Sequence, residues 1–528
     1  MKLFEMNLFG SAQRHLILSF IALSLFSEPV LAQTKPSAAS KAAASEHRTE
    51  LGLAAAKSSP LALRAWLYKM PKGGDLHNHI FGAVYAETWI QDAVDDHMCI
   101  DSASLTLDKS QPDGACAKNE VPAAQAFRDQ ILYDALIDAF SMRSFVPSAG
   151  VSAHDHFFAS FAKFGNNMDL HHLGEWLDEL ATRAAAQNEQ YLELMHTPAF
   201  THASAAAIAA GWQDDFAQLR EAQLSHGLRD DIAITRASAD AADADRAKRE
   251  HCQEPDATPA CQVKIRYLYQ VLRGLPKEIV FAQTLLAFET ASVDPRFVGI
   301  NFVMPEDGYI AMRDYTLHMQ MLDFFHKLYP KVPISLHAGE LAPGLVPFEG
   351  LCCHIHQAID LGHARRIGHG VTVMYETHPH ELLKQMAKQH VMVEINLTSN
   401  DGILGVSGKN HPFETYRQFH VPLALSTDDE GVSRSDMTNE FVRAVQTYEL
   451  HYADLKQLVR SSLEHSFLPG DSLWRAQDDF TSLVSACAHD TPGAASPSAP
   501  CEAALKASEK AQQQWELERR FQEFEAQF

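Results

Sequence analysis

Eight short runs with the composition of β-strands recur along the chain, and they constrain its fold more than any other feature. Helical patterns such as Tyr315–Leu328 and Glu376–His390 separate most of them. Strands that alternate with helices usually pair in parallel, because each helix carries the chain back across the sheet. Eight such units predict an α/β fold of the closed (β/α)8 TIM barrel type. The runs are Asp75–His79, Tyr191–His196, Lys264–Val271, Phe297–Val303, Pro333–His337, Arg366–His369, Val391–Asn396 and Pro422–Thr427.

An open, doubly wound sheet is the competing interpretation of this alternation. Such sheets bind dinucleotides at a glycine-rich turn after the first strand. Neither a GxGxxG sequence nor a P-loop follows an early run here, which favours the barrel. The interval 84–190 is longer than one connecting helix requires, so we expect a mostly helical insertion over the mouth of the barrel.

The N-terminal segment has the composition of an export signal. Basic residues precede the apolar run Leu16–Phe26, and Val30 and Ala32 follow with the small-residue spacing of a cleavage site. We therefore expect a signal peptide at 1–32 and a protein that is periplasmic or secreted. An uncleaved membrane anchor is the alternative, and it is disfavoured because the run is shorter than the ~20 residues that span a bilayer.

The remainder of the chain divides into three predicted parts. Residues 33–62 are rich in Ala, Ser and Lys and form a linker that becomes helical. Residues 63–485 form the barrel with its insertion, and 486–528 form a C-terminal helical extension. Within that extension we expect one charged helix over Cys501–Phe528 that packs on the body, and a homodimer contact through it stays open.

The cysteines agree with export. Local pairs that flank polar, turn-rich stretches form bridges only in oxidising compartments. No pair has the CxxC spacing of a thiolate zinc site, and the adjacent Cys352 and Cys353 could be free buried thiols. The three local pairs that we expect are Cys99–Cys116, Cys252–Cys261 and Cys487–Cys501.

The formal net charge of −23 restricts the partners. An acidic surface repels nucleic acid backbones and anionic membranes. We therefore expect no nucleic-acid partner, no membrane partner after signal cleavage, and a small neutral substrate.

Two of the runs that end in histidine carry candidate metal ligands. His77 and His79 are two residues apart in a predicted strand, so both imidazoles face the same side and suit a borderline cation such as Zn²⁺. His337 ends another run, and Glu340 follows after a tight Ala-Gly turn. A carboxyl group in a dry pocket beside a metal can have a raised pKa and donate a proton. Each motif alone is also compatible with a structural role.

Two further motifs follow later runs. His369 lies between two glycines, which suggests an open approach for a catalytic imidazole. Asp428, Asp429 and Glu430 follow one another after the last run. Adjacent carboxylates repel unless a cation intervenes, so Asp428 is a candidate metal ligand and Asp429 remains free to bind substrate. Because barrel chemistry lies at the carboxyl ends of the strands, all four motifs predict one site.

The order HxH, HAGE, GHG and Thr-Asp-Asp resembles the adenosine/AMP deaminase family of metallo-dependent hydrolases. The sequence from Met70 to His77 and the signal peptide resemble its secreted, adenosine deaminase growth factor-like branch. The resemblance implies one zinc ion per chain and hydrolytic replacement of a purine 6-amino group, with loss of ammonia. It assigns the metal ligands to His77, His79, His337 and Asp428, protonation of purine N1 to Glu340, orientation and deprotonation of the attacking water to His369, and contact with N7 to Asp429.

Two positions depart from the family pattern and affect the substrate. Ile80 and Phe81 stand where an Asp usually contacts the ribose 5′ hydroxyl. An apolar residue leaves that hydroxyl unpaired and favours 5′-deoxy or 5′-thioether nucleosides. Met304 stands near a strand-end glycine whose backbone reaches N3, and its side chain would narrow the pocket. The predicted substrate is therefore a purine nucleoside, either adenosine or a 5′-modified adenosine such as methylthioadenosine, with adenine or another 6-aminopurine as an open alternative.

Two other functional classes compete with this prediction. One is another metal-dependent amidohydrolase that cleaves an amide or a lactone. The other is a non-catalytic extracellular protein that binds nucleosides or signals. Both are disfavoured because every ligand and catalytic position of the deaminase pattern is filled.

Overall fold

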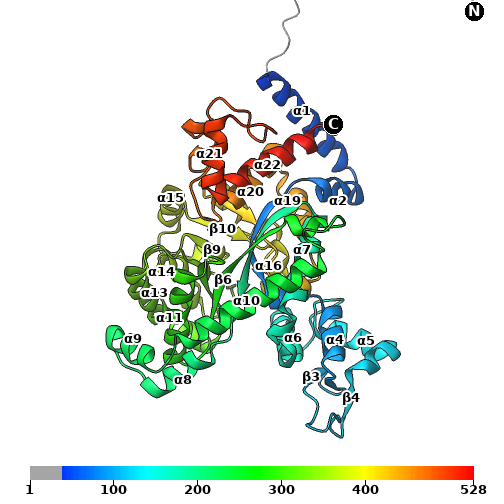
Figure 1. Ribbon diagram of the computed structural model, residues 1–528, viewed down its shortest axis with the longest axis vertical. Helices are drawn as coiled ribbons and strands as arrows, with labels where there is room; N and C mark the ends of the chain where they lie inside the picture. Colours follow the sequence, from blue (N-terminus) through cyan, green and yellow to red (C-terminus); the bar gives the residue numbers. More distant parts are fainter. Residues whose placement is uncertain (1–37) are drawn as a thin grey trace, which may run out of the picture. The chain divides into compact units, whose positions relative to one another are not determined.

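The computed structural model describes residues 38–528 (Figure 1). The predicted signal peptide, 1–32, lies outside the described residues. The chain divides into two compact units, and the larger one, Ser45–Phe528, contains all of the strands and the site. No helix in the described part of the chain is both long enough and apolar enough to cross a membrane.

Eight parallel strands form two four-stranded sheets, with the orders β1-β5-β6-β7 and β11-β10-β9-β8. Every predicted strand is present, with bounds within two residues of the prediction. Isolated parallel bridges pair Asn78 with Asp428 and Ile300 with Ile334. The fold is therefore α/β with parallel sheets. The strands are β1 (Gly73–His79), β5 (Glu189–His196), β6 (Lys264–Leu272), β7 (Phe297–Val303), β8 (Ser335–Ala338), β9 (Arg366–His369), β10 (Met392–Ile395) and β11 (Leu423–Leu425).

The strands are covered on both faces, which explains their continuous apolar sequences. All residues of β1, β5, β8, β9, β10 and β11 are buried. Helices follow most strands in the chain (Figure 1). Those after β5 are α8 (Thr201–Ala210), α9 (Phe216–Ser225), α10 (Asp230–Arg249), α11 (Lys277–Val293), α12 (Tyr309–Arg313), α13 (Tyr315–Leu328), α14 (His354–Asp360), α15 (Pro379–Gln389), α16 (Leu397–Leu404), α17 (Phe413–Gln418), α18 (Glu430–Ser433), α19 (Met437–Tyr448) and α20 (Tyr452–Glu464).

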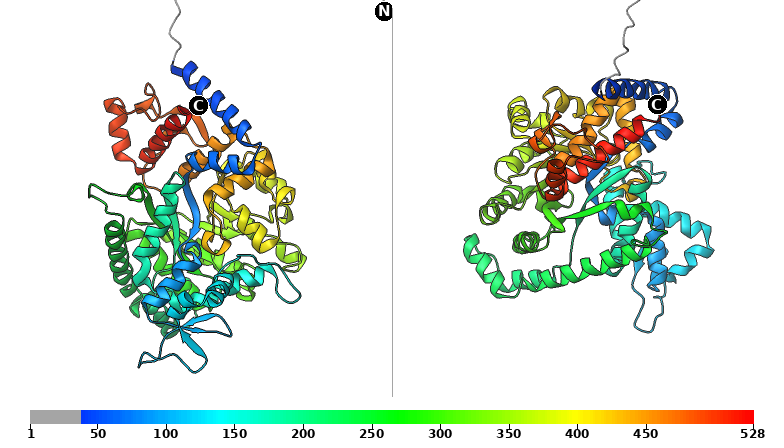
Figure 2. Two further views of the ribbon diagram at one scale, coloured as in Figure 1. Left: turned by 90° about the vertical axis from the view of Figure 1, so that its right-hand side faces the viewer. Right: turned by 45° about the horizontal axis from the view of Figure 1, so that its top comes forward.

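The segment between β1 and β5 is mostly helical, as predicted, but it also contains a small antiparallel sheet of order β3-β2-β4. In Figure 1 and in the left view of Figure 2, this insertion (blue to cyan) and the C-terminal helices (red) lie on opposite sides of the strands. Its elements are α3 (Ile80–Ala83), α4 (Ala86–Asp95), β2 (Cys99–Asp101), β3 (Thr106–Asp108), β4 (Glu120–Pro122), α5 (Gln130–Ala139), α6 (Ala153–Phe164) and α7 (Leu173–Ala186).

The ends of the larger unit are helical. Helices α1 (Ala38–Ala56) and α2 (Pro60–Lys69) precede β1, and a hairpin of β12 (Trp474–Ala476) and β13 (Asp479–Leu483) follows α20. The prediction of one helix over Cys501–Phe528 is wrong. The chain forms α21 (Ala499–Ala507) and α22 (Glu509–Glu525), because Ser508 is extended and its hydroxyl caps α22 by accepting a bond from the Ala511 amide.

All three predicted disulfides are present: Cys99–Cys116, Cys252–Cys261 and Cys487–Cys501. The expectation of free thiols at Cys352 and Cys353 is wrong, since these two residues are joined to each other.

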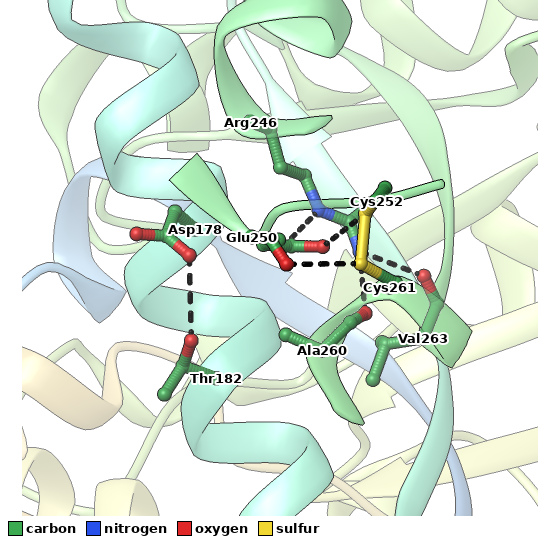
Figure 3. Close-up of a disulfide and its surroundings, with 8 residues drawn as sticks. All are labelled: Asp178, Thr182, Arg246, Glu250, Cys252, Ala260, Cys261 and Val263. Carbon is green, nitrogen blue, oxygen red and sulfur yellow. Dashed lines mark hydrogen bonds and ion pairs between the residues drawn. A yellow bond between two sulfur atoms is a disulfide. The ribbon is translucent and has the colours of Figure 1, made fainter. Parts of the chain in front are cut away.

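The Cys252–Cys261 bridge closes the loop between α10 and β6 (Figure 3). Arg246 reinforces this closure, because its Nη2 donates to the carbonyls of Ala260 at 2.8 Å and Val263 at 3.0 Å. The end of α10 is thereby fastened to the start of β6.

Candidate active site and metal centre

The four predicted metal ligands meet at the carboxyl ends of β1 and β8 and in the turn after β11. One donor atom from each of His77, His79, His337 and Asp428 lies within 4.8 Å of the others, and all four residues are buried. The Asp428 Oδ1 atom lies 3.3 Å from His77 Nε2 and 3.1 Å from His79 Nε2. The two Nε2 atoms of His79 and His337 are 3.2 Å apart.

Backbone pairing creates this convergence. The bridge between Asn78 and Asp428 sets the turn after β11 beside the end of β1. The Asp428 amide donates to the His77 carbonyl at 2.8 Å, and the His79 amide donates to the Asp428 carbonyl at 3.2 Å. Asp428 has a φ of 61°, a left-handed conformation that is uncommon for residues other than glycine. The chain thus holds this carboxylate in place with an unusual turn.

Each imidazole of the cluster is held at Nδ1 by a buried polar side chain, which leaves Nε2 directed at the centre. Metal-binding histidines are commonly oriented in this way. The pairs are His77 with Glu394 at 2.7 Å, His79 with Gln270 at 2.6 Å and His337 with Asn301 at 2.8 Å.

The donor set fits a divalent cation. His77 Nε2 is buried and makes no hydrogen bond, so a ligand to it is missing from the protein itself. Burial lowers the pKa of His77, but the adjacent carboxylates of Asp428 and Glu394 outweigh this and raise it to about 10. The position therefore stabilises positive charge. Three imidazoles and one carboxylate are the donors that a borderline cation such as Zn²⁺ prefers.

Glu340 lies beside the cluster and is 8% exposed. Burial raises the pKa of its carboxyl well above the usual range, and the charges of Asp428 and Glu306 add to the effect. Glu306 accepts from the backbone amides of Gly339 at 2.9 Å and Glu340 at 2.7 Å, which fixes the turn after β8. This shift favours the protonated form of Glu340, which suits a hydrogen-bond or proton donor.

His369 departs from the expectation of an open approach. Its side chain is fully buried, because Gly368 makes room for the His77 ring and Gly370 for the Tyr416 hydroxyl. The His369 Nε2 atom lies 3.7 Å from Glu340 Oε1. The flanking glycines therefore serve packing rather than access.

A hydrogen-bond chain assigns the proton of His369. The Phe413 amide donates to His411 Nδ1 at 3.2 Å, so neutral His411 carries its proton on Nε2 and donates it to Asn400 Oδ1 at 3.0 Å. The Asn400 amide then donates to His369 Nδ1 at 2.9 Å. Burial lowers the pKa of His369 to about 3, so the ring is neutral and presents an N–H at Nε2.

A cavity of about 1070 Å³ opens beside the cluster. His79, His337, Glu340 and Asp428 form its inner end. The rest of the lining is largely apolar, and Lys109 is the one Lys or Arg among the described residues that line the cavity. Phenylalanines make up a large part of this apolar lining, among them Phe157, Phe158, Phe161 and Phe200.

The three predicted substrate-binding residues all line this cavity: Asp429, Phe81 and Met304. Burial raises the pKa of Asp429 to about 7. The carboxylate of Asp429 lies so close to Gly82 that a Cβ there would be 1.6 Å from Oδ1. Met304 has a φ of 90°, a conformation that favours glycine.

Gln270, Asn301 and Glu394 were missed by the sequence prediction. Each is a polar residue inside an otherwise apolar strand, in KIRYLYQVL, FVGINFV and MVEI respectively. Buried polar side chains require partners, so a polar residue in such a strand is a usable signal. A polar residue in such a strand would have predicted a buried polar site at these positions. It would not have identified the histidine with which each residue pairs.

A family model described as adenosine deaminase matches residues 175–480. The match includes Glu340, His369 and two of the four clustered donors, His337 and Asp428, whereas His77 and His79 precede it.

Curated relatives are similar over a shorter stretch. An adenosine deaminase from Enterococcus faecalis is 31% identical over 142 residues, which is 26% of this chain and 38% of that protein. One from Clostridium acetobutylicum is 29% identical over 137 residues, again 26% of this chain and 38% of that protein. The matched stretch thus spans less than two fifths of these relatives.

A solved structure extends the likeness of the fold. The crystal structure of Arabidopsis ADAL complexed with IMP covers 76% of this chain and 93% of its own, with a TM-score of 0.50 and 20% sequence identity. At this identity the likeness concerns the fold alone.

Proposed function

The chain belongs to the adenosine deaminase family, and on this premise we propose that it is a zinc-dependent hydrolytic deaminase of a 6-aminopurine nucleoside. The observation that carries the proposal is a carboxyl with a raised pKa, Glu340, and a neutral imidazole, His369, beside a buried four-donor cluster. Hydrolytic deamination needs these groups together, because a ring nitrogen gains a proton as water attacks the adjacent carbon.

The proposed architecture is one closed (β/α)8 barrel. The bridge between Ile300 and Ile334 lies where β7 and β8 face each other, and the bridge between Asn78 and Asp428 joins β1 to the chain after β11. Two bridges at these edges would make a single ring of eight parallel strands. In such barrels the active site lies at the carboxyl ends of the strands, where the four donors lie here.

We assign one zinc ion per chain to His77, His79, His337 and Asp428. When bound, zinc supplies Lewis-acid activation of water at neutral pH.

Three residues around the cluster have separate proposed roles toward the purine and the attacking water. Glu340 donates its proton to N1 of the purine, which makes C6 more electrophilic. Asp429, whose pKa is near 7, hydrogen bonds at N7. His369 orients the attacking water by donating from Nε2. The family resemblance also implies that His369 deprotonates this water. To accept that proton at Nε2, His369 must first lose the proton that Nε2 carries.

Ammonia release from a panel of 6-aminopurines tests the proposal directly. We expect the zinc-loaded enzyme to release ammonia from at least one nucleoside, and no release from any member of the panel would refute the proposal. Glu340→Gln should lower turnover by about 10²–10⁴-fold while the zinc content is unchanged. Glu349→Gln is the matched control, because Glu349 is exposed and lies on the same stretch of chain. A non-catalytic nucleoside-binding protein would be insensitive to both changes.

The apolar end of the cavity favours a 5′-modified adenosine as a second candidate substrate. Phe157, Phe158 and Phe161 from α6 and Phe200 after β5 line this end. These four phenylalanines offer no hydrogen-bond partner to a 5′ hydroxyl or phosphate but accommodate an alkylthio group. We expect kcat/KM for 5′-methylthioadenosine to exceed that for adenosine by about 10-fold or more and AMP to react most slowly. Equal values for all three would exclude this substrate class without affecting the deaminase assignment.

We also propose that the protein is exported to the periplasm or secreted. All eight cysteines are paired, and disulfides of this kind persist in oxidising compartments. Fractionation of the source cells tests this, and protein confined to the cytosolic fraction would contradict it.

A further inference from the structure

A second group of metal-type donors lies in the insertion, outside the cluster described above. It consists of Asp96, at the end of α4, and of the consecutive residues His171 and His172, which end the short helix η3 (Leu170–His172). His171 Nε2 lies 3.1 Å from Asp96 Oδ1, and His172 Nε2 lies 3.3 Å from Asp96 Oδ2. Both imidazoles therefore direct the same nitrogen at one carboxylate.

Each of these imidazoles also has a carboxylate behind it. His171 Nδ1 lies 3.0 Å from Asp169 Oδ1, and His172 Nδ1 lies 3.8 Å from Asp92 Oδ1. A carboxylate at Nδ1 fixes the ring and makes Nε2 a better donor to a metal, and this arrangement is common behind metal-ligating histidines. His171 has this arrangement, whereas the carboxylates of Asp92 and Glu175 both lie farther from His172 Nδ1, at 3.8 Å.

The protein leaves two atoms of this group without a hydrogen bond. His172 Nε2 is buried and has no hydrogen-bond partner despite its closeness to Asp96, and the side chain of His172 is 9% exposed. Asp92 Oδ1 is also buried and without a hydrogen bond, while Asp92 Oδ2 accepts from Trp176 Nε1 at 2.8 Å. Unpartnered buried polar atoms are costly, so a nine-tenths buried nitrogen directed at a carboxylate indicates a missing ligand.

We propose that Asp96, His171 and His172 bind a second divalent transition-metal ion, with zinc as the first candidate. Two imidazoles and one carboxylate match the ligand preferences of zinc and exclude magnesium and calcium, which prefer oxygen donors alone. His171 is half exposed, so water completes the coordination. This site is separate from the cluster of His77 and needs none of its residues.

The site lies where it can act on the cavity. Met168, Asp169 and Leu170, directly before the two histidines, line the cavity. A metal held between this stretch and Asp96 would therefore fasten part of the cavity wall to α4. The ion is structural in this role, because no donor of the group lines the cavity.

Zinc stoichiometry tests the proposal without any measure of turnover. The zinc-loaded enzyme is dialysed against buffered zinc, and the metal per chain is measured by mass spectrometry. We expect two zinc ions per chain in the wild type and one in His171→Gln and in Asp96→Asn. His251→Gln is the matched control, since exposed His251 also pairs through Nδ1 with a carboxylate, Asp256 at 2.8 Å, and should keep two ions.

Thermal unfolding gives a second, independent measurement. Adding zinc to protein whose first site is filled should raise the unfolding temperature of the wild type and of His251→Gln, because a ligand that binds only the folded state stabilises it. The same addition of zinc should leave the unfolding temperature of His171→Gln unchanged. Equal zinc content and equal shifts in wild type and His171→Gln would overturn the proposal and leave an ordinary ion-pair cluster. Catalytic failure with two zinc ions bound would overturn only the proposed function.

Discussion

Glu394 provides a quantitative test of the metal centre from outside the ligand set. Its Oε2 accepts from His77 Nδ1 at 2.7 Å, and its Oε1 accepts from Arg366 Nε at 2.6 Å and Ser335 Oγ at 2.9 Å. Burial raises its pKa, but Arg366 and the hydrogen bond from His77 outweigh this, so the pKa is lowered and the carboxyl is ionised. Glu394→Gln keeps the shape and removes the charge that orients His77.

The expected magnitude follows from these contacts. Loss of a partner behind a metal ligand typically weakens metal affinity by about 10–100-fold, equivalent to about 1.4–2.7 kcal/mol. The effect on stability should be smaller than the about 3–5 kcal/mol for an unpaired buried charge. The reason is that Arg366 keeps a second carboxylate, Glu193, 2.5 Å from its Nη2.

The assay is a competitive zinc titration of metal-free protein against a chromophoric chelator. We expect half-saturation of Glu394→Gln at a free zinc concentration about 10–100-fold above that of the wild type. Glu518→Gln is the matched control, because this buried carboxylate also pairs with an arginine, Arg460 at 2.7 Å, but holds no donor of the cluster. Unchanged zinc affinity in Glu394→Gln, or an equal loss in both variants, would refute the argument.

Three further predictions concern other parts of the molecule. A Cβ at Gly82 would lie 1.6 Å from Asp429 Oδ1, so Gly82→Ala should displace that carboxylate and lower kcat/KM at constant zinc content; an unchanged kcat/KM would contradict this. Burial lowers the pKa of His196 from 6.5 to about 3. Between these two pH values the unfolded chain binds one more proton than the folded protein. The free energy of unfolding therefore decreases as the pH falls through this range, by at most about 1.4 kcal/mol per pH unit. The unfolding temperature of His196→Phe should therefore depend less on pH between these values than that of the wild type. An equally steep dependence in the variant would count against the assignment. Replacing Cys252 and Cys261 with serine removes a cross-link across a separation of 9 residues, so the free energy of unfolding should fall by about 2–3 kcal/mol, and an unshifted denaturant midpoint would show that the bridge contributes nothing.

The sequence predicted the strands and the donor cluster because both depend on local patterns. His77 and His79 share a face by the period of a strand, and the carboxyl ends of parallel strands lie at the same end of the fold. The positions of His337 and Asp428 at the ends of their runs were therefore enough to predict that the two residues lie close together.

Two errors have different origins. Gly368 and Gly370 suggested open space around His369, but the rings of His77 and Tyr416, which come from distant segments, occupy it. The break between α21 and α22 follows from a local serine cap at Ser508, which lies inside an otherwise continuous helical pattern. The first error could not be avoided from the residues that flank His369, whereas the second overlooked a capping residue.

Chemistry and substrate choice come from different parts of this chain. The four donors lie at strand ends, whereas α6 of the insertion supplies much of the apolar cavity wall, so the wall can change without altering the cluster.

Phe81 stands at the boundary, because it follows β1, lines the cavity and packs on Trp176 with ring centroids 5.7 Å apart. Trp176 donates to Asp92, the carboxylate behind His172 in the proposed second site. A metal in the proposed second site would consequently affect the position of the cavity wall and not the proposed proton-transfer groups, Glu340 and His369. Its loss in His171→Gln should therefore raise KM more than it lowers kcat, and a fall in kcat alone would contradict this division.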